Sequence, residues 1–194
     1  MILPAGAYRY EIRRAASLIA FETVNFDGHA IVGERRFTDS ANRYEVSAEL
    51  AEDSSIARVT LSYARGPFTR AARYEVVDDY LRGQITAMAS RNVVTAKLGR
   101  FREIDADLVI FRALIIARVR ARGQTRWTGR VAAINSATLV AASNKQSARS
   151  ADATGLAWIY EARMGESEEI QLDAEGRIIS RRDRMGTEAI LIAP

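Results

Sequence analysis

The sequence predicts an all-β fold, a large curved antiparallel sheet (a half-barrel or β-roll) with one short helix packed in its concavity. The first observation is a repeated word: Arg9-Tyr10-Glu11-Ile12 recurs as Arg43-Tyr44-Glu45-Val46 and as Arg73-Tyr74-Glu75-Val76. Each copy spaces a tyrosine and an aliphatic residue two apart between charged residues, which is typical of a strand with one buried face. The second observation is that such segments are short and separated by turn signals. The third is one stretch near residue 110 with helical spacing.

The N-terminal half is predicted to be a series of hairpins. Asp27-Gly28, Gly66-Pro67 and Asp78-Asp79 are turn signals, and the first is typical of a two-residue hairpin loop. We expect strands at residues 8–12, 18–26, 31–37, 44–50, 59–63, 72–76, 81–88 and 93–98.

The C-terminal part is predicted to be a meander that follows Gly123. We expect its strands at residues 125–134, 138–142, 158–164, 169–172, 177–183 and 187–192. Residues 143–154 are small and polar without aromatic side chains, which predicts a mobile loop. With 48% hydrophobic residues, a single β-rich domain over residues 1–194 can bury a substantial core.

Residues 104–119 depart from strand spacing, because their large apolar residues fall on one helical face and Asp105 or Asp107 can cap the start. We expect a helix near residues 104–116. From residue 115 the alternation returns, with Arg118, Arg120 and Arg122 on one face of a strand. The content of β-branched residues leaves an all-strand interpretation open.

The composition excludes several classes of site. Cysteine is absent, which removes disulfides, thiolate metal sites and cysteine nucleophiles, and His29 is the only histidine. The carboxylate pairs Asp78-Asp79 and Glu168-Glu169 are adjacent, so on a strand they point to opposite faces and do not suit a glycosidase. An enzyme is therefore not the favoured class, and no metal or cofactor is expected.

The first ten residues carry no signal-peptide pattern, and no run of about 18 apolar residues could span a bilayer. We therefore expect a cytoplasmic protein as the sequence stands, or a periplasmic or envelope protein if its N-terminus was trimmed. The oligomeric state does not follow from the sequence.

Arginine dominates the basic residues, since only Lys97 and Lys145 are lysines among 28 Lys and Arg, and the net charge is +4. Eight arginines fall between residues 100 and 130, close to Trp127, against three acidic residues. Such a row suits a phosphate, a lipid head group or a nucleic-acid backbone. The plainer interpretations are GC-rich codon usage and a solvated strand face that protects an edge from aggregation.

The tyrosines are the other candidate for a binding surface. Those of the repeated words are expected on the apolar side of the sheet, where their rings form a core or line a cavity for an apolar or amphiphilic ligand. The choice depends on whether the helix fills the concavity.

Several segments together resemble a bacterial family of unknown function. They are the Asp-led stretch 105–111, Arg112-Ala113-Leu114, the basic stretch ending at Gly123, and Gly176-Arg177-Ile178-Ile179 near the end. The start, Tyr8 to Ile12, fits as well. The resemblance implies a protein that is usually exported, with a fold similar to the lipoprotein carriers, and it hints at amphiphile binding.

The first functional hypothesis is a non-catalytic protein that binds a lipid-like or amphiphilic anion in the concave face. The second is a structural or interaction module that docks a protein or nucleic acid through the arginine-rich strand face, with nucleic acid the less favoured partner. The candidate ligand-binding residues are Tyr10, Tyr44, Tyr74, Phe111, Arg112, Arg118, Arg120, Arg122, Arg126 and Trp127.

Overall fold

The computed structural model describes residues 3–88, 90–163 and 166–193, and in these residues the chain forms 15 strands and one helix. The helix is α1 (Val109–Ala121). The first strands are β1 (Gly6–Arg14), β2 (Ser17–Phe26), β3 (Ala30–Phe37), β4 (Arg43–Leu50), β5 (Ile56–Arg65), β6 (Phe68–Val77), β7 (Tyr80–Ala87) and β8 (Ser90–Lys97). The others are β9 (Glu103–Asp105), β10 (Arg126–Ile134), β11 (Ala141–Ser150), β12 (Ala157–Arg163), β13 (Glu166–Leu172), β14 (Ile178–Asp183) and β15 (Thr187–Ala193).

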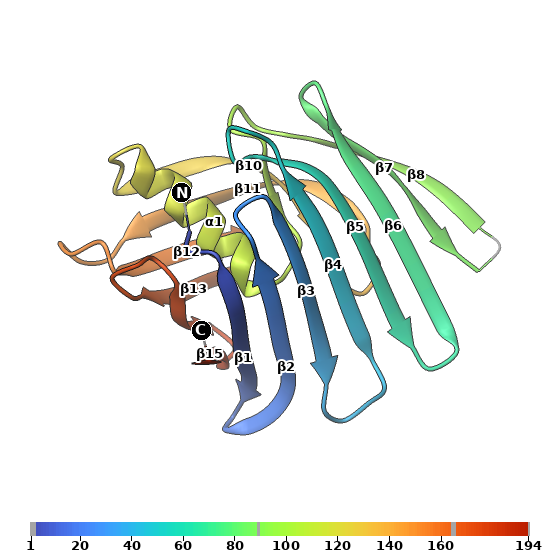
Figure 1. Cartoon of the computed structure of the whole chain (residues 1–194), viewed down its shortest axis with the longest axis horizontal. Helices are drawn as coiled ribbons and strands as arrows, with labels where there is room; N and C mark the ends of the chain where they lie inside the picture. The colour runs from blue at the N-terminus through green and yellow to red at the C-terminus, as the bar shows by residue number, and fades with distance from the viewer. Residues whose placement is uncertain (1–2, 89, 164–165, 194) are drawn as a thin grey trace.

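These strands form one curved sheet in the order β8-β7-β6-β5-β4-β3-β2-β1-β15-β14-β13-β12-β11-β10-β9 (Figure 1). Neighbouring strands are antiparallel except for β9 and β10, which are parallel. Because β1 pairs with β15, the two ends of the chain meet in the middle of the sheet, and β8 and β9 are its edges. The prediction of a large curved antiparallel sheet with a short helix is confirmed.

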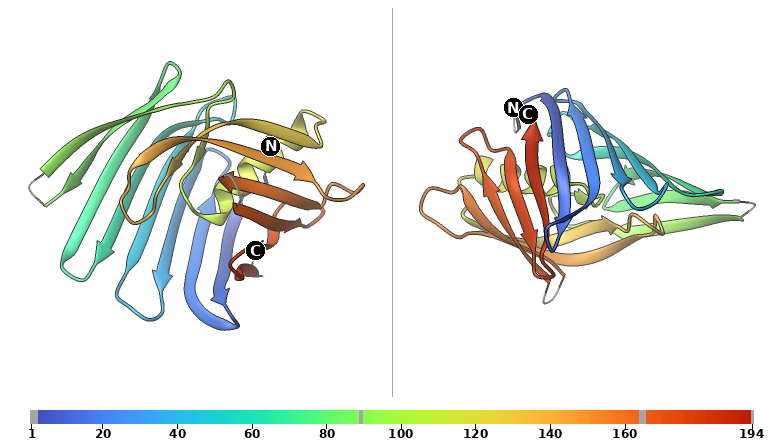
Figure 2. Two further views of the ribbon diagram at one scale, coloured as in Figure 1. Left: turned by 180° about the vertical axis from the view of Figure 1, so that it is seen from behind. Right: turned by 90° about the horizontal axis from the view of Figure 1, so that it is seen from below.

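The sheet folds back on itself as two arms, β1–β8 and β10–β15, with α1 between them (Figure 2). The arms also meet near the end of β8. The amide of Gly99 donates a hydrogen bond to the Arg130 carbonyl at 3.1 Å, and the Ser143 hydroxyl donates one to the Lys97 carbonyl at 2.6 Å. The helix is therefore enclosed, and its residues from Val109 to Val119 are all buried.

The repeated word marks equivalent strands of the sheet. Tyr10, Tyr44 and Tyr74 lie in β1, β4 and β6, and all three are fully buried. The hydroxyls of Tyr44 and Tyr74 each donate a hydrogen bond of 2.7 Å to a backbone carbonyl, of Ala106 and Leu139 respectively. These bonds attach one arm of the sheet to the segments that flank α1 and β10.

Side chains fill the concavity. The buried apolar residues of both arms and of α1 form one continuous cluster. Leu108 packs so closely on Gly33 of β3 that a methyl group at position 33 would lie 2.5 Å from its Cδ1 atom. Of the two sequence-based interpretations of the tyrosines, the core is therefore the one that fits.

The helix begins and ends later than predicted. Residues 103–105 form β9, where Ile104 pairs with Ala132 of β10. Asp107 then adopts a left-handed conformation with φ of 61°, and α1 starts at Val109 without a side-chain cap from its N-cap residue. Because residues 103–105 pair with β10 as a strand, the first turn of the expected helix does not form.

The predicted strand with Arg118, Arg120 and Arg122 on one face is wrong, because α1 continues to Ala121. A helix turns by about 100° per residue, so side chains two positions apart point in nearly opposite directions. Burial explains why the alternation misleads, since a helix enclosed on all sides needs no polar stripe and its apolar residues lose their period. Arg118 and Arg122, four positions apart, share one side of the helix, but Arg120 points away from it, so the three do not form the proposed row.

The loop expected at residues 143–154 is also wrong over most of its length, because β11 continues to Ser150. Its residues alternate after all: Gln146 and Ala148 are buried beside β10 and β12, while Lys145 and Arg149 are exposed. Ala148 lies between Trp127 of β10 and Tyr160 of β12 in the register of the sheet, and the low hydrophobicity of β11 hides the strand in the sequence. Met164, expected at the end of β12, lies outside the described residues.

Candidate functional site

Two of the predicted arginines are buried on α1 and have acidic partners. Arg118 Nη1 donates to Glu103 Oε2 at 2.8 Å, and Arg118 Nη2 donates to the Phe101 carbonyl at 2.9 Å. Burial raises the pKa of the Glu103 carboxyl to about 7, although Arg118 and Arg122 act in the opposite direction. Arg112 forms an ion pair with Asp105. These pairs join α1 to the short strand β9.

The other three predicted arginines are dispersed. Arg120 lies half-buried at the end of α1, and its Nη1 atom approaches Gly176. Arg122 stacks on the Phe101 ring with its Cζ atom 3.7 Å from the ring centre. Arg126 is exposed at the start of β10. Arg118 and Arg122 thus meet at Phe101 and Glu103, but the predicted cluster of five arginines is not brought together as a whole.

The predicted aromatic residues are core residues in this structure. Phe111 is buried in the first turn of α1, and the three tyrosines of the repeated words are also buried. Trp127 is buried in β10, and its indole ring covers Gly129 of the same strand. These rings are buried among core residues and form no exposed cavity wall in this structure. A role for them in ligand binding stays a prediction.

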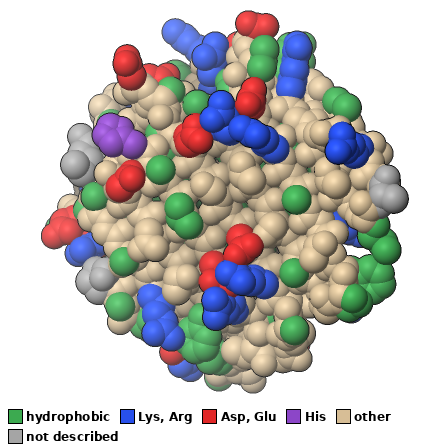
Figure 3. Space-filling model, turned by 45° about the vertical axis from the view of Figure 1, so that its right-hand side comes forward, with side chains coloured by type: hydrophobic (Ala, Val, Ile, Leu, Met, Phe, Trp, Pro, Cys, Tyr) green, Lys and Arg blue, Asp and Glu red, His purple; other side chains and the backbone are tan. Residues whose placement is uncertain are grey.

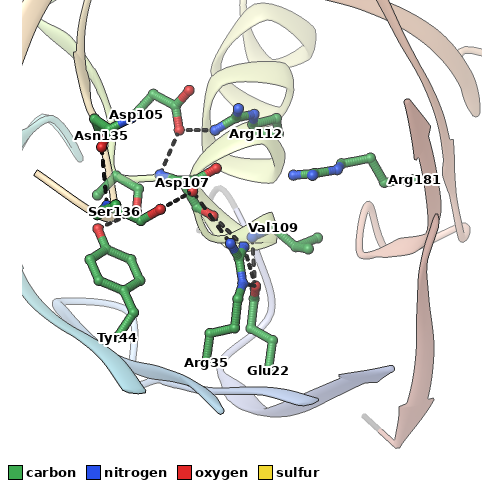
Figure 4. Close-up of polar contacts among 12 residues, drawn as sticks. Glu22, Arg35, Tyr44, Asp105, Asp107, Val109, Arg112, Asn135, Ser136 and Arg181 are labelled. Carbon is green, nitrogen blue, oxygen red and sulfur yellow. Dashed lines mark hydrogen bonds and ion pairs between the residues drawn. The ribbon is translucent and has the colours of Figure 1, made fainter. Parts of the chain in front are cut away.

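A buried polar network surrounds the start of α1 (Figure 4). Glu22 of β2 accepts hydrogen bonds from Arg35 Nη2 at 2.8 Å and from the Val109 amide at 2.7 Å. Arg35 also pairs with Asp107, whose Oδ2 atom accepts from the Ser136 hydroxyl at 2.7 Å. Glu22 therefore caps the helix from another strand, which places its negative charge where the helix dipole favours it.

These residues were missed by sequence reasoning, but a signal exists for them. Glu22 falls in phase with the buried residues Ala20 and Val24 of β2, and Arg35 falls in phase with Ile31 of β3. A charged side chain at an apolar position of an alternating strand must find a buried partner. Charges that keep the apolar phase are thus the pattern to search for.

An open groove lies at the other end of the concave face, where β5–β8 extend beyond the helix toward the right of Figure 1. Its volume is about 860 Å³. Phe68 and Met88 are 60% and 81% exposed there. The groove is lined by Tyr63, Arg65, Phe68, Thr69, Arg70, Ala87, Met88, Ser90 and Ala137.

All charged residues of the hairpin ends that form this groove are basic. Residues 62–72 and 83–95 contain three arginines and no acidic residue. Arg65 is exposed and has no ion pair within the described residues, and Arg70 donates to the Ala137 carbonyl at 2.8 Å. Apolar side chains and cationic groups therefore meet in one concave surface.

Unlike the groove, the outward face of the sheet carries exposed arginines that are paired with carboxylates. Arg58 of β5 contacts Glu49 of β4 at 2.9 Å and Glu75 of β6 at 3.2 Å. Figure 3 shows acidic and basic side chains close together at several places on one face of the molecule. Carboxylates that neutralise exposed arginines in this way weaken any attraction to a polyanion.

Within the described residues, no cluster of His, Asp and Glu is suited to hold a metal ion. The single helix of that part of the chain falls short of the length needed to cross a bilayer.

Comparison with known proteins supports the fold. A crystal structure of a DUF1089 family protein from Pseudomonas aeruginosa superposes with a TM-score of 0.62 and 19% sequence identity. The match covers 86% of this chain and 90% of the other. Neither the family models nor the curated proteins include a match to this sequence. The neighbour is thus a bacterial protein whose family name denotes unknown function, and the similarity carries no activity over to this chain.

Proposed function

We propose that this protein is a non-catalytic binding protein for an anionic amphiphile, which it holds in the open groove at the ends of β5–β8. The observation that carries the proposal is the combination of exposed Phe68 and Met88 with Arg65 and Arg70 in one concave surface without acidic residues. An acyl chain would cover the apolar side chains, and its carboxylate or phosphate would lie against the arginines.

Exposure of large apolar side chains in a concavity favours such a ligand. Burying a Phe or Met side chain is worth about 1.5–3 kcal/mol, so a chain that covers both gains a substantial part of its binding energy there. Guanidinium groups complement carboxylates and phosphates through paired N–H donors. Around α1 the apolar side chains of the concave face pack into one core cluster, so an acyl chain finds exposed apolar side chains only in this groove.

The test is titration with a fluorescent fatty acid, with the uncharged alcohol of the same chain length as competitor. We expect Phe68→Ser and Arg65→Gln each to weaken binding about tenfold, because each removes roughly 1.4 kcal/mol or more. Val32→Ser and Arg73→Gln are the matched controls, since Val32 is 56% exposed and Arg73 is exposed, and neither lines the groove.

Binding of the fatty acid that is equal in all four variants would refute the proposal. So would competition by the alcohol as strong as by unlabelled fatty acid, because the arginines would then have no role. Co-sedimentation with anionic vesicles, compared with neutral ones, distinguishes a membrane surface from a single extracted molecule as the source of the amphiphile.

A further inference from the structure

A second cavity lies on the side of α1 that faces β10–β14, and it differs from the groove in its polar lining. Its volume is about 320 Å³, within the range of small-ligand pockets. The rim carries exposed residues, Asn135, Ala142 and Glu166 among them, whereas the floor residues Asp105 and Gln146 are buried. The cavity therefore has an exposed rim and a buried polar floor.

Three charged side chains that line this cavity keep unused hydrogen-bonding atoms. They belong to Arg112 of α1, Arg181 of β14 and Glu168 of β13, whose side chains are 6%, 11% and 9% exposed. Arg112 Nε, Arg181 Nε, Arg181 Nη1 and Glu168 Oε2 are buried and have no hydrogen-bond partner among the described residues. Figure 4 shows Arg181 extended toward Arg112 from the opposite side.

The distances explain why these atoms remain unused. Glu168 Oε2 lies 3.5 Å from Arg112 Nε and 3.8 Å from Arg181 Nε, within reach of an ion pair but too far for a hydrogen bond. Arg112 is held in place by Asp105 and by the Tyr160 ring, 5.7 Å from its Cζ atom. A buried donor without a partner costs free energy, so two such guanidinium groups are suited to a ligand that accepts from both.

The charge of the lining determines the kind of ligand. Two arginines of the lining face five carboxylates, those of Asp105, Asp107, Glu166, Glu168 and Asp183. Arg35, which is not part of the lining, pairs with Asp107, so two negative charges remain in excess. A simple anion would satisfy the guanidinium donors but would add to this negative excess. A simple cation would reduce the excess but would leave the donors unused. A molecule with both charges answers both requirements.

We infer that this cavity binds a small zwitterion of the amino-carboxylate class. Its carboxylate lies against the guanidinium groups of Arg112 and Arg181 and competes with Glu168 for their free donors, and its cationic group lies toward Glu166 and Asp183. This site is separate from the groove and does not depend on the proposed function, because the two sites share no lining residue.

The test uses the standard free α-amino acids and glycine betaine as probes, with propionate and propylammonium as analogues that carry only one of the two charges. Each is first screened at ~1 mM by thermal shift and then titrated by calorimetry. We expect at least one zwitterion to bind and neither single-charge analogue to do so. Amphiphile binding to the groove is measured separately, so failure of one site is distinguishable from failure of the other.

The decisive variant is Arg181→Gln, with Arg182→Gln as its matched control. Arg182 is the next residue of β14, is exposed and does not line the cavity. We expect Arg181→Gln to raise the Kd about tenfold or more and Arg182→Gln to change it less than about twofold. Asp183→Asn provides a second variant on the acidic side of the lining, with the same expected loss, in case Arg181→Gln does not fold.

Several results would overturn the inference. They are the absence of binding by every zwitterion of the panel, binding of propionate or propylammonium as tight as that of the best zwitterion, and equal affinity of the Arg181→Gln and Arg182→Gln proteins.

Discussion

Replacement of Glu22 by alanine is expected to destabilise the protein far more than removal of any surface carboxylate. The Glu22 side chain is 0% exposed and accepts from Arg35 Nη2 at 2.8 Å, from Arg35 Nε at 3.2 Å and from the Val109 amide at 2.7 Å. The alanine variant leaves Arg35 with Asp107 as its remaining acidic partner, and it leaves a helix amide without an acceptor. Removing one partner of a buried ion pair costs about 3–5 kcal/mol.

This loss would be a large fraction of the total stability of a domain, which is about 5–15 kcal/mol. Urea denaturation at pH 7, followed by circular dichroism, measures it as a lower midpoint with an unchanged slope. Glu22→Gln keeps an oxygen acceptor for Val109 but loses the charge, so we expect an intermediate loss. Glu22→Leu combined with Arg35→Met removes both charges and should recover part of the stability that Glu22→Ala loses, while the Val109 amide still lacks its acceptor.

The matched control is Glu49→Ala. Glu49 is 59% exposed and pairs with Arg58 at 2.9 Å, and exposed pairs of this kind contribute about 0–1 kcal/mol. If Glu22→Ala loses no more stability than Glu49→Ala, the reasoning that Glu22 connects β2, β3 and α1 is refuted.

Three further predictions concern stability. Gly33→Ala should cost about 1–3 kcal/mol in urea denaturation, because the new methyl group meets Leu108. Tyr74→Phe should cost about 1–3 kcal/mol in the same assay, because the Leu139 carbonyl loses its buried donor. Burial raises the pKa of Glu103 from 4.5 to about 7, so its ionisation opposes folding and stability should fall as the pH rises from 4.5 to 7. Glu103→Gln should remove up to about 3 kcal/mol of this pH dependence, as measured by unfolding at several pH values.

Each of these predictions has a control. A methyl group at Gly6 meets no atom closer than 3.9 Å, so Gly6→Ala should change stability by less than about 0.5 kcal/mol. Tyr80 is half-buried and its hydroxyl makes no hydrogen bond within the described residues, so Tyr80→Phe should be similarly neutral. An unchanged pH dependence in the Glu103→Gln protein would contradict the assignment of that slope to Glu103.

The parts of the fold that were predictable from the sequence are those set by local period. The repeated words around Tyr10, Tyr44 and Tyr74 identify strands because alternation alone places the tyrosine on the buried face. This result does not depend on which strands lie beside it. The ends of α1 were not predictable in this way. Its first turn is replaced by β9, whose pairing with β10 is a contact with a strand more than 20 residues away. A helix buried on all sides also carries no amphipathic period that marks its end.

The candidate sites likewise combine residues that local sequence identifies with an arrangement that only distant contacts determine. Arg112 was identified as a ligand-binding candidate within the predicted helix, but its position opposite Arg181 was not predicted. The partners of Arg112 in the cavity depend on a contact between strands, because the pairing of β13 with β14 brings Glu168 and Arg181 together. The groove was missed because its composition, small and basic with isolated apolar residues, is typical of ordinary hairpin ends. Only the three-dimensional arrangement shows which of those side chains share a concave surface.

The pairing of β1 with β15 has a consequence for synthesis of the protein on the ribosome. The side chains of Arg14 and Thr187, 173 residues apart, contact each other across this ladder at 3.2 Å. Contacts of such separation form late, since the entropy of closing the intervening chain opposes them. Until β15 is made, a nascent chain that has already formed the β1–β8 hairpins presents the edge of β1 unpaired. In crowded polysomes that edge is the place where two growing chains would pair with each other and aggregate.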